Sequence, residues 1–219
     1  MARNYVFAPE EYYHLYARGV EKMPVYRDKA DYQRFLEGMY IFNTSRSVNL
    51  KDIHRKITRS PTSARKAKMH LFDVDRRDTL VDIGAYCLMP NHFHILIREK
   101  DAKGKGVSKF MQKLMTAYTM YYNKKRARTG ALFGSSYKAR HVVDDVHLKY
   151  LFAYIHLNPA ELVARGQLEK YAYSSYSDYL DIKRKQRAII NPHAFPNYFS
   201  PDEMKDEVEE WLLHDVPEV

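Results

Sequence analysis

Two apolar runs joined by a very short corner constrain the fold of this chain more than any other feature. Residues 80–88 and 92–98 are both rich in the apolar and β-branched side chains that favour strands. The corner between them, Met89-Pro90-Asn91, consists of turn formers and is far too short for a crossover helix. The two strands must therefore be antiparallel neighbours in one sheet.

The rest of the chain predicts an α+β fold. Further strands are expected at 11–18 and 137–143, and helices at 28–40, 107–125, 146–157 and 158–163, where apolar residues recur at helical spacing. This order predicts an antiparallel sheet with helices on one face. We expect residues 1–180 to form one domain.

Two segments are predicted to be additions to this domain. Residues 43–79 contain the basic run 59–68 and are expected to form a basic loop or arm with weak local structure. Residues 181–219 are expected to form a C-terminal helical extension, with an acidic helix at 201–213.

The composition favours a polyanionic partner, either nucleic acid or an anionic membrane surface. The chain has 219 residues with a formal net charge of +9, and it is rich in aromatics, with 19 Tyr and 10 Phe. Cations interleaved with aromatic rings suit phosphate contacts beside stacked bases. The single cysteine, Cys87, excludes an intramolecular disulfide and any Cys-rich zinc module. Because no apolar run reaches membrane-spanning length and the N-terminus lacks a signal-peptide core, we expect a cytoplasmic protein with no membrane partner.

The sequence His92-Phe93-His94 is half of a possible metal site. Successive side chains of a strand point to opposite faces, so His92 and His94 project to the same side. Two adjacent imidazoles can bind a divalent metal. Such a pair on its own is more often a surface or packing feature.

The helix predicted at 146–157 offers a candidate nucleophile and a candidate third metal ligand to complete the histidine pair. Tyr150, Tyr154 and Asn158 are spaced four residues apart and lie on one helix face. A tyrosine hydroxyl beside metal-bound imidazoles can attack phosphorus, and the Asn158 oxygen can complete a ligand set for Mg²⁺ or Mn²⁺. Taken singly, each tyrosine also fits a core position, and Asn158 also fits a helix cap.

Taken together, these residues resemble a known family. Residues 90–96 (PNHFHIL) look like the HUH motif (His, hydrophobic, His) of single-tyrosine transposases, and residues 154–159 (YIHLNP) look like the box that carries their nucleophile. Weaker matches lie at 13–19, 123–133, 137–138 and 173–176. The similarity extends over residues 11–180, and REP-associated tyrosine transposases are the branch it most resembles.

The resemblance implies a ferredoxin-like (RRM-like) domain that cleaves and rejoins single-stranded or hairpin DNA. Tyr154 would attack a phosphodiester to give a 5′-phosphotyrosine, with His92, His94 and Asn158 as metal ligands. Some relatives are dimers, whereas the REP-associated branch tends towards monomers, so we expect a monomer or a homodimer. The sequence departs from the family pattern at Ala17, at Ala160-Glu161 and in the longer segment 43–78.

Several further residues are predicted to contact DNA. They are His14, Arg18, Lys103, Lys105, Lys138 and Arg140. His14, on a strand expected near the histidine pair, fits a contact with the metal site or a core position equally well. Tyr150 is the alternative nucleophile. Two other functions stay open at this point: a non-catalytic DNA-binding repressor on the same scaffold, and a metal-dependent phosphodiesterase that uses activated water.

Overall fold

A computed structural model describes residues 6–59, 70–180, 182–198, 200, 203–205 and 208. Its strands are β1 (Tyr12–Arg18), β2 (Val81–Met89), β3 (His92–Glu99) and β4 (Lys138–His141). Its α-helices are α1 (Lys29–Ile41), α2 (Leu50–Arg59), α3 (Gly106–Lys125), α4 (Asp145–Leu157) and the short α5 (Tyr176–Tyr179). Six short 3₁₀ segments connect them: Val20–Lys22, Leu71–Asp73, Asn158–Leu162, Leu168–Lys170, Lys185–Ile189 and Pro192–Ala194. None of the helices in the described part of the chain has the length and apolar character needed to span a membrane.

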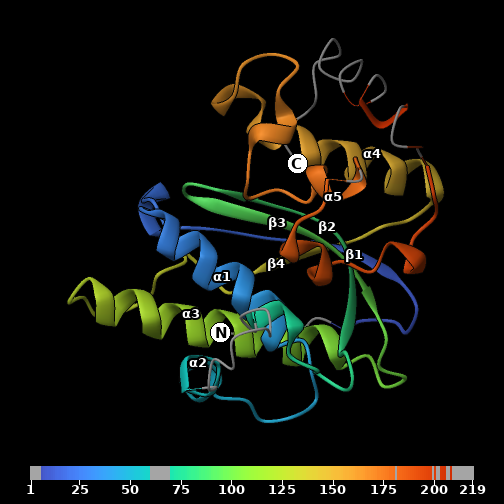
Figure 1. Cartoon of the computed structure of the whole chain (residues 1–219). Helices are drawn as coiled ribbons and strands as arrows, with labels where there is room; N and C mark the ends of the chain where they lie inside the picture. Colours follow the sequence, from blue (N-terminus) through green and yellow to red (C-terminus); the bar gives the residue numbers. More distant parts are fainter. Residues whose placement is uncertain are drawn as a thin grey trace, which may run out of the picture.

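The four strands form one antiparallel sheet in the order β2-β3-β1-β4 (Figure 1). This confirms the predicted α+β class, the four strands and the antiparallel hairpin of β2 and β3. The hairpin corner is held by the segment after β1, because Gly19 N–H donates to the carbonyl of Asn91 (2.8 Å) and Val25 N–H donates to that of Pro90 (2.8 Å). A side chain at Gly19 would meet the Met23 carbonyl oxygen, so this close approach requires glycine.

The two faces of the sheet differ in chemistry. Leu15, Phe93 and Ile95 point to one face and join the larger hydrophobic core with residues of α1 and α3. The opposite face carries histidine and charged side chains over β1, β3 and β4. In the strand register Tyr16 pairs with His94, Arg18 pairs with His92, and Tyr16 also pairs with Lys138.

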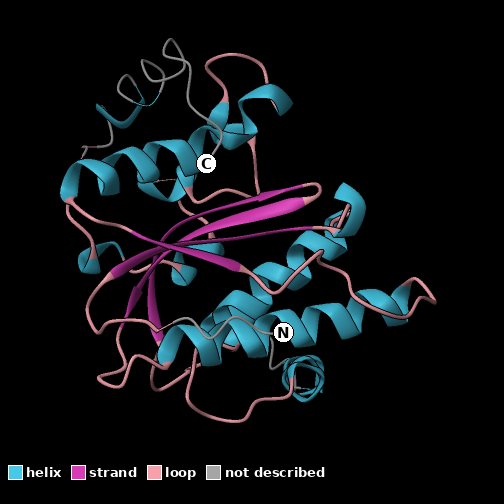
Figure 2. Ribbon diagram, turned by 180° about the vertical axis from the view of Figure 1, so that it is seen from behind, coloured by secondary structure: helices cyan, strands magenta, loops and turns pink. Residues whose placement is uncertain are grey.

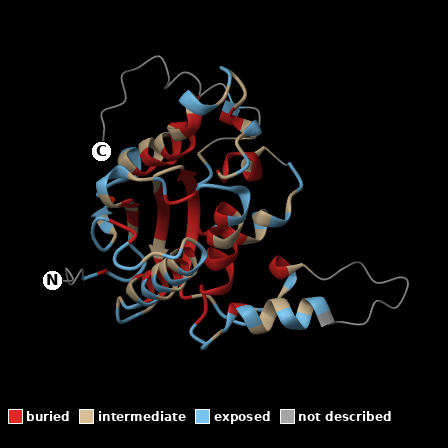
Figure 3. Ribbon diagram, turned by 90° about the vertical axis from the view of Figure 1, so that its left-hand side faces the viewer, coloured by how far each residue is buried: buried red, intermediate tan, exposed pale blue. Residues whose placement is uncertain are grey.

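Helices cover both faces of the sheet, so the prediction of helices on one face was wrong. α1 and α3 lie on one side and α4 lies on the other (Figures 1 and 2). Leu151 and Ile155 of α4 pack with Cys87 and Leu96 of the sheet in a second hydrophobic cluster. The reason is that β2 and β3 are apolar on both faces, and each face needs a cover. Figure 3 shows the buried sheet between these layers.

The predicted weak structure of residues 43–79 also needs correction, because part of this segment is helical. Leu50 of α2 is buried, and Ile53 and Ile57 pack against the larger core at helical spacing. The 3₁₀ turn Leu71–Asp73 follows, with Leu71 and Phe72 buried. The basic run 59–68 lies almost entirely outside the described residues.

The segment 182–198 packs against the β2 side of the sheet. Asn191 N–H donates to the carbonyl of Ile83 (2.9 Å), and Phe195 fills the space above Gly84. Arg184 donates to Asp178 and to the hydroxyl of Tyr86. The predicted acidic helix at 201–213 lies mostly outside the described residues.

Candidate active site

A cavity of about 780 Å³ lies between the polar face of the sheet and the C-terminal end of α4. It is lined by the four residues predicted to form a metal and nucleophile site, His92, His94, Tyr154 and Asn158. The strand pleat brings the two imidazoles to one face, and the α4 helix spacing brings the tyrosine and the asparagine above them. The sheet and the helix thus each supply half of the site.

His92 is held by the amide of Asn91, its neighbour in the hairpin corner. The Asn91 oxygen Oδ1 lies 2.6 Å from Nδ1 of His92, while its amide nitrogen Nδ2 donates to the carbonyl of Lys22 (3.2 Å). Because an amide oxygen only accepts, Nδ1 of His92 carries the hydrogen. The other nitrogen, Nε2, therefore keeps a lone pair that can bind a metal.

His94 contacts a third histidine, His14 of the neighbouring strand β1. Nδ1 of His94 lies 2.8 Å from Nε2 of His14, and the two rings are nearly parallel with centroids 5.0 Å apart. His14 is completely buried, with 0% of its surface exposed. In this structure His14 thus contacts the histidine pair from within the sheet, and its contact with DNA stays a prediction.

All three imidazoles are held in the neutral form. Burial, followed by the positive charge of Arg18, lowers the pKa of His92 to about 4. Burial and the neighbouring His14 keep the pKa of His94 well below its ordinary value. Burial, helped by Arg140 and His147, lowers the pKa of His14 to about 3. Neutral imidazole is the form that ligates metals.

Tyr154 is the tyrosine that faces the histidine pair. Its ring is perpendicular to that of His94 with centroids 5.5 Å apart, and it is half-buried in the cavity wall. Tyr150 stacks on Tyr154 one helical turn earlier, with centroids 6.1 Å apart, but Tyr150 does not line the cavity. Of these two tyrosines, Tyr154 is therefore the one that shares the cavity with the histidine pair.

Asn158 ends α4 and is oriented by that helix. Its amide nitrogen Nδ2 donates to the carbonyl of Tyr154 (2.8 Å). Protonated His92 would donate from Nε2 to the Asn158 side chain, and this partly offsets the effect of burial and of Arg18 on the His92 pKa. In the neutral form Nε2 of His92 keeps its lone pair and forms no such bond. With Nδ2 committed to the helix, the oxygen Oδ1 is the atom turned towards the imidazole.

Three of the predicted DNA-contacting cations line the cavity. They are Arg18 at the end of β1 and Lys138 and Arg140 on β4. Lys103 and Lys105 follow β3 at its far end, roughly 25 Å from the His92 end by strand length. The structure therefore separates these two lysines from the cavity.

The donor set fits a divalent cation with mixed nitrogen and oxygen ligands. His92 presents a lone pair at Nε2, Asn158 presents an amide oxygen, and His94 has its Nδ1 already occupied by His14. The described residues contain no group of three or more His, Cys, Asp or Glu side chains that could hold a metal. A cation here would thus need the amide oxygen, and water or phosphate for the rest.

Sequence reasoning missed several residues of the cavity. Tyr16, Glu21, Lys22, Asn91 and Glu161 also line it. Tyr16 could have been predicted, because residues 14, 16 and 18 of a strand point to the same face. Asn91 immediately precedes the histidine pair in a tight corner, which is a typical position for a residue that orients a ligand.

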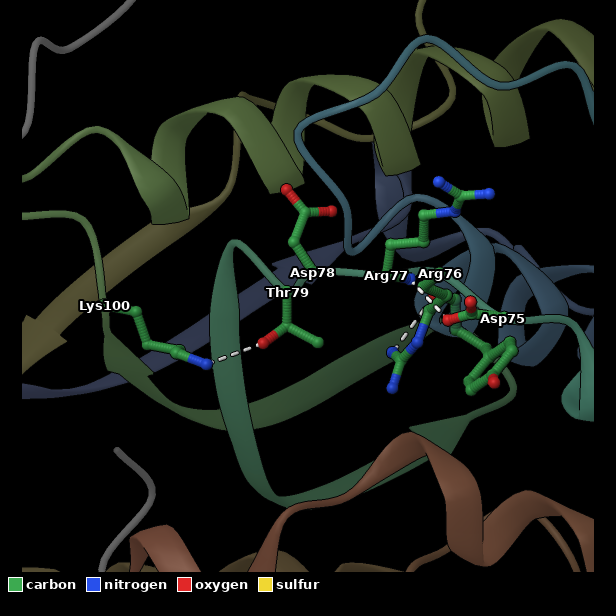
Figure 4. Close-up of a pocket in the computed structure, with 7 residues that line it drawn as sticks. Asp75, Arg76, Arg77, Asp78, Thr79 and Lys100 are labelled. Carbon is green, nitrogen blue, oxygen red and sulfur yellow. Dashed lines mark hydrogen bonds between the residues drawn. The ribbon is translucent and has the colours of Figure 1, made fainter.

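A second pocket of about 380 Å³ lies at the other end of the β2–β3 hairpin (Figure 4). Its polar groups bond to one another: Lys100 Nζ donates to Thr79 Oγ1 (2.7 Å), and the Arg76 guanidinium lies 4.0 Å above the ring of Tyr40. This pocket lacks the paired imidazoles and the tyrosine of the first cavity.

Comparisons with known proteins identify a family and a similar fold. A family model described as "Transposase IS200 like" matches residues 46–158, which include both histidines, Tyr154 and Asn158. A solved structure of a REP-associated tyrosine transposase bound to a REP hairpin is similar in fold, with a TM-score of 0.54 and 12% sequence identity. The match covers 91% of this chain and 99% of that one. A search of curated proteins gave no match.

Proposed function

Because the chain belongs to the IS200-like transposase family, we propose that it cleaves and rejoins single strands of DNA with Tyr154 as the nucleophile. The observation that carries this proposal is the position of Tyr154. Its ring faces His94 at 5.5 Å across a cavity that also contains His92 and Asn158. A nucleophile, a possible metal-ligand set and phosphate-binding cations thus share one cavity.

In the proposed reaction the Tyr154 oxygen forms a bond to phosphorus as the bond from phosphorus to the 3′ oxygen breaks. The tyrosine hydroxyl loses its proton, and the departing 3′ oxygen gains one. The products are a 5′-phosphotyrosine and a free 3′-hydroxyl. Attack by a 3′-hydroxyl on the phosphotyrosine reverses these steps and joins the strands.

Arg18, Lys138 and Arg140 would bind the phosphate before and during this attack. All three line the cavity, and arginine and lysine side chains bind phosphate oxygens strongly. A divalent cation such as Mg²⁺ or Mn²⁺, held by His92, His94 and Asn158, would draw charge from a phosphoryl oxygen.

We infer that the DNA is single-stranded or forms a hairpin. The structurally similar REP-associated transposase was solved with a REP hairpin. The formal charge of +9 suits contacts to a phosphate backbone, and Tyr16 in the cavity wall offers a ring for an unpaired base.

The test is a covalent-adduct assay. The protein is incubated with labelled hairpin DNA and Mg²⁺ or Mn²⁺, then denatured and run on a gel. We expect a labelled protein–DNA adduct for the wild type and none for Tyr154→Phe, which lacks the attacking oxygen. Tyr150→Phe is the matched control, because it removes the same atom one turn earlier on α4, and it should retain the adduct.

Other outcomes would identify the alternatives. Cleavage that persists in Tyr154→Phe without an adduct would indicate a phosphodiesterase that uses water. Hairpin binding by the wild type without cleavage under any metal condition would indicate a DNA-binding repressor. An adduct lost in Tyr150→Phe and kept in Tyr154→Phe would move the nucleophile to Tyr150.

A further inference from the structure

We propose that His14 is a positioning residue that holds the ring of His94 with its Nε2 free to bind a metal. It does so by accepting a hydrogen bond from Nδ1–H of His94. The inference rests on the proposed function only in taking His94 as a metal ligand.

The contact between the two histidines is short and enclosed. Nε2 of His14 lies 2.8 Å from Nδ1 of His94, and the exposed fractions of the two residues are 0% and 5%. The residues come from neighbouring central strands, where Tyr16 is the direct partner of His94 and His14 is the diagonal one. With both rings buried in the sheet, water cannot substitute for the bond between them.

The two possible directions of this bond have different consequences. A neutral imidazole carries one hydrogen, so one ring donates and the other accepts. If His14 donates, the hydrogen of His94 must lie on Nε2, and that nitrogen cannot bind a metal. If His94 donates from Nδ1, its Nε2 keeps the lone pair. A metal on His94 therefore requires His14 to accept.

His92 shows the same arrangement with a simpler partner. The Asn91 oxygen accepts from Nδ1 of His92 at 2.6 Å, which leaves Nε2 of His92 for a ligand. His14 would accept a hydrogen bond from Nδ1 of His94, as Asn91 does from Nδ1 of His92. Both histidines of the pair then present the same nitrogen.

His14 differs from Asn91 in one respect, because an imidazole can accept at Nε2 only if its own hydrogen lies on Nδ1. Nδ1 of His14 is buried and has no hydrogen-bond partner among the described residues. No hydrogen bond at Nδ1 from the described part of the chain therefore selects the tautomer of His14. A metal on Nε2 of His94 requires a lone pair at that nitrogen. This requirement selects the tautomer of His14 that has its hydrogen on Nδ1.

Amide substitutions test the bond with little change in polarity. The side-chain amide of His14→Gln reaches the position of Nε2 and can accept from His94. The shorter amide of His14→Asn reaches only the position of Nδ1, and the ring of His14→Phe fills the space without an acceptor. Mn²⁺ affinity is measured by titration calorimetry on each full-length protein, with thermal unfolding as a check of folding.

We expect His14→Gln to bind Mn²⁺ within about threefold of the wild type. His14→Asn and His14→Phe should bind about 10- to 100-fold more weakly, the usual loss when the partner of a metal-bound histidine is removed. A purely structural role would instead rank the variants by thermal stability. Equal affinity of the wild type and His14→Asn, or equal loss in His14→Gln and His14→Phe, would overturn the inference.

A measurement on the wild type alone gives an independent answer. In ¹⁵N-histidine NMR with saturating Mg²⁺, we expect the hydrogen of His94 on Nδ1 and that of His14 also on Nδ1. A hydrogen on Nε2 of His94 in the metal-bound protein would contradict the proposal. If folded wild-type protein binds no metal at all, the metal site of the proposed function and this inference both fail. If the wild type binds metal but the His14 variants do not differ as expected, only this inference fails.

Discussion

At the scale of single residues, the cavity depends on groups that only orient others. Asn91 is the clearest case, because its amide bonds both His92 and the carbonyl of Lys22. We predict that Asn91→Ala lowers Mn²⁺ affinity by about tenfold, since His92 loses the acceptor that fixes its tautomer. Titration calorimetry measures this change.

A matched control for this substitution lies far from the cavity. Asn191 bonds Asp82 through its amide nitrogen (2.9 Å), so Asn191→Ala also removes a side-chain hydrogen bond. It should leave Mn²⁺ affinity unchanged. If Asn91→Ala binds Mn²⁺ as tightly as Asn191→Ala does, Asn91 does not orient the site.

The spacing of residues was sufficient to predict that the main residues of the candidate site share one cavity. His92 and His94 share a face because of the strand pleat, and Tyr154 and Asn158 share a face because they are one helical turn apart. The role of His14 was not predictable in this way. Its burial depends on β1 lying between β3 and β4, and strand order is a property of the whole sheet.

At the scale of elements, an ion-pair cluster joins the start of α1 to the end of α3. Asp28 and Asp31 both bond the side chains of Lys125 and Arg126. The hydrogen bond from Lys125 is the main cause that lowers the pKa of Asp28 to about 2. Burial alone would raise the pKa of Asp31, but hydrogen bonds from Lys125, Arg27 and Arg126 outweigh it and lower the pKa.

This cluster predicts a pH dependence of stability. Both carboxyls have a lower pKa in the folded chain than the value of about 4 expected in the unfolded chain. Their contribution is therefore present above about pH 4 and is lost as the pH falls below that value, in the case of Asp28 towards its folded pKa of about 2. At pH 7, Asp31→Asn should lower the free energy of unfolding by about 2 kcal/mol, because Asp31 is buried while its partners are partly exposed.

Urea unfolding at several pH values tests this prediction. The difference between Asp31→Asn and the wild type should shrink below pH 4, where the wild-type carboxyl also loses its charge. Asp52→Asn is the control, because Asp52 and its partner Arg55 are about half exposed and their pair should contribute at most about 0.5 kcal/mol. A constant difference from pH 7 to pH 2 would refute the electrostatic explanation.

Two elements show where the sequence was insufficient. α2 was missed because its many charges suggested an exposed arm, although Leu50, Ile53 and Ile57 carry the helical repeat. The position of α4 on the second face of the sheet was missed for a different reason. The apolar residues on α4 show that it packs, but they do not show against which face.

At the scale of the whole molecule, charge is distributed unevenly with respect to the cavity. Lys138 and Arg140 line it, whereas Lys103 and Lys105 lie beyond the far end of β3. We predict an effect of the double variant Lys138→Ala/Arg140→Ala on the binding of single-stranded DNA. The slope of the logarithm of the association constant against the logarithm of the salt concentration should become shallower by about 1.4, or about 0.7 for each phosphate that the protein no longer neutralises. Fluorescence anisotropy at several salt concentrations measures this slope.

The charge-matched control is Lys103→Ala/Lys105→Ala. It removes the same net charge from the opposite end of the hairpin and should change the slope by much less. Equal slopes for the two double variants would show that DNA binding depends on net charge alone and not on the cavity.

Tyr154 and His94 lie close together within one chain, and this limits how many DNA ends one molecule can hold. Under the proposed chemistry, Tyr154 can bond to one phosphorus at a time, so each molecule holds at most one DNA end. Exchange of two ends then takes two molecules acting together, or one molecule in two successive rounds. The number of nucleophiles in the chain thus decides how many partners a complete exchange requires.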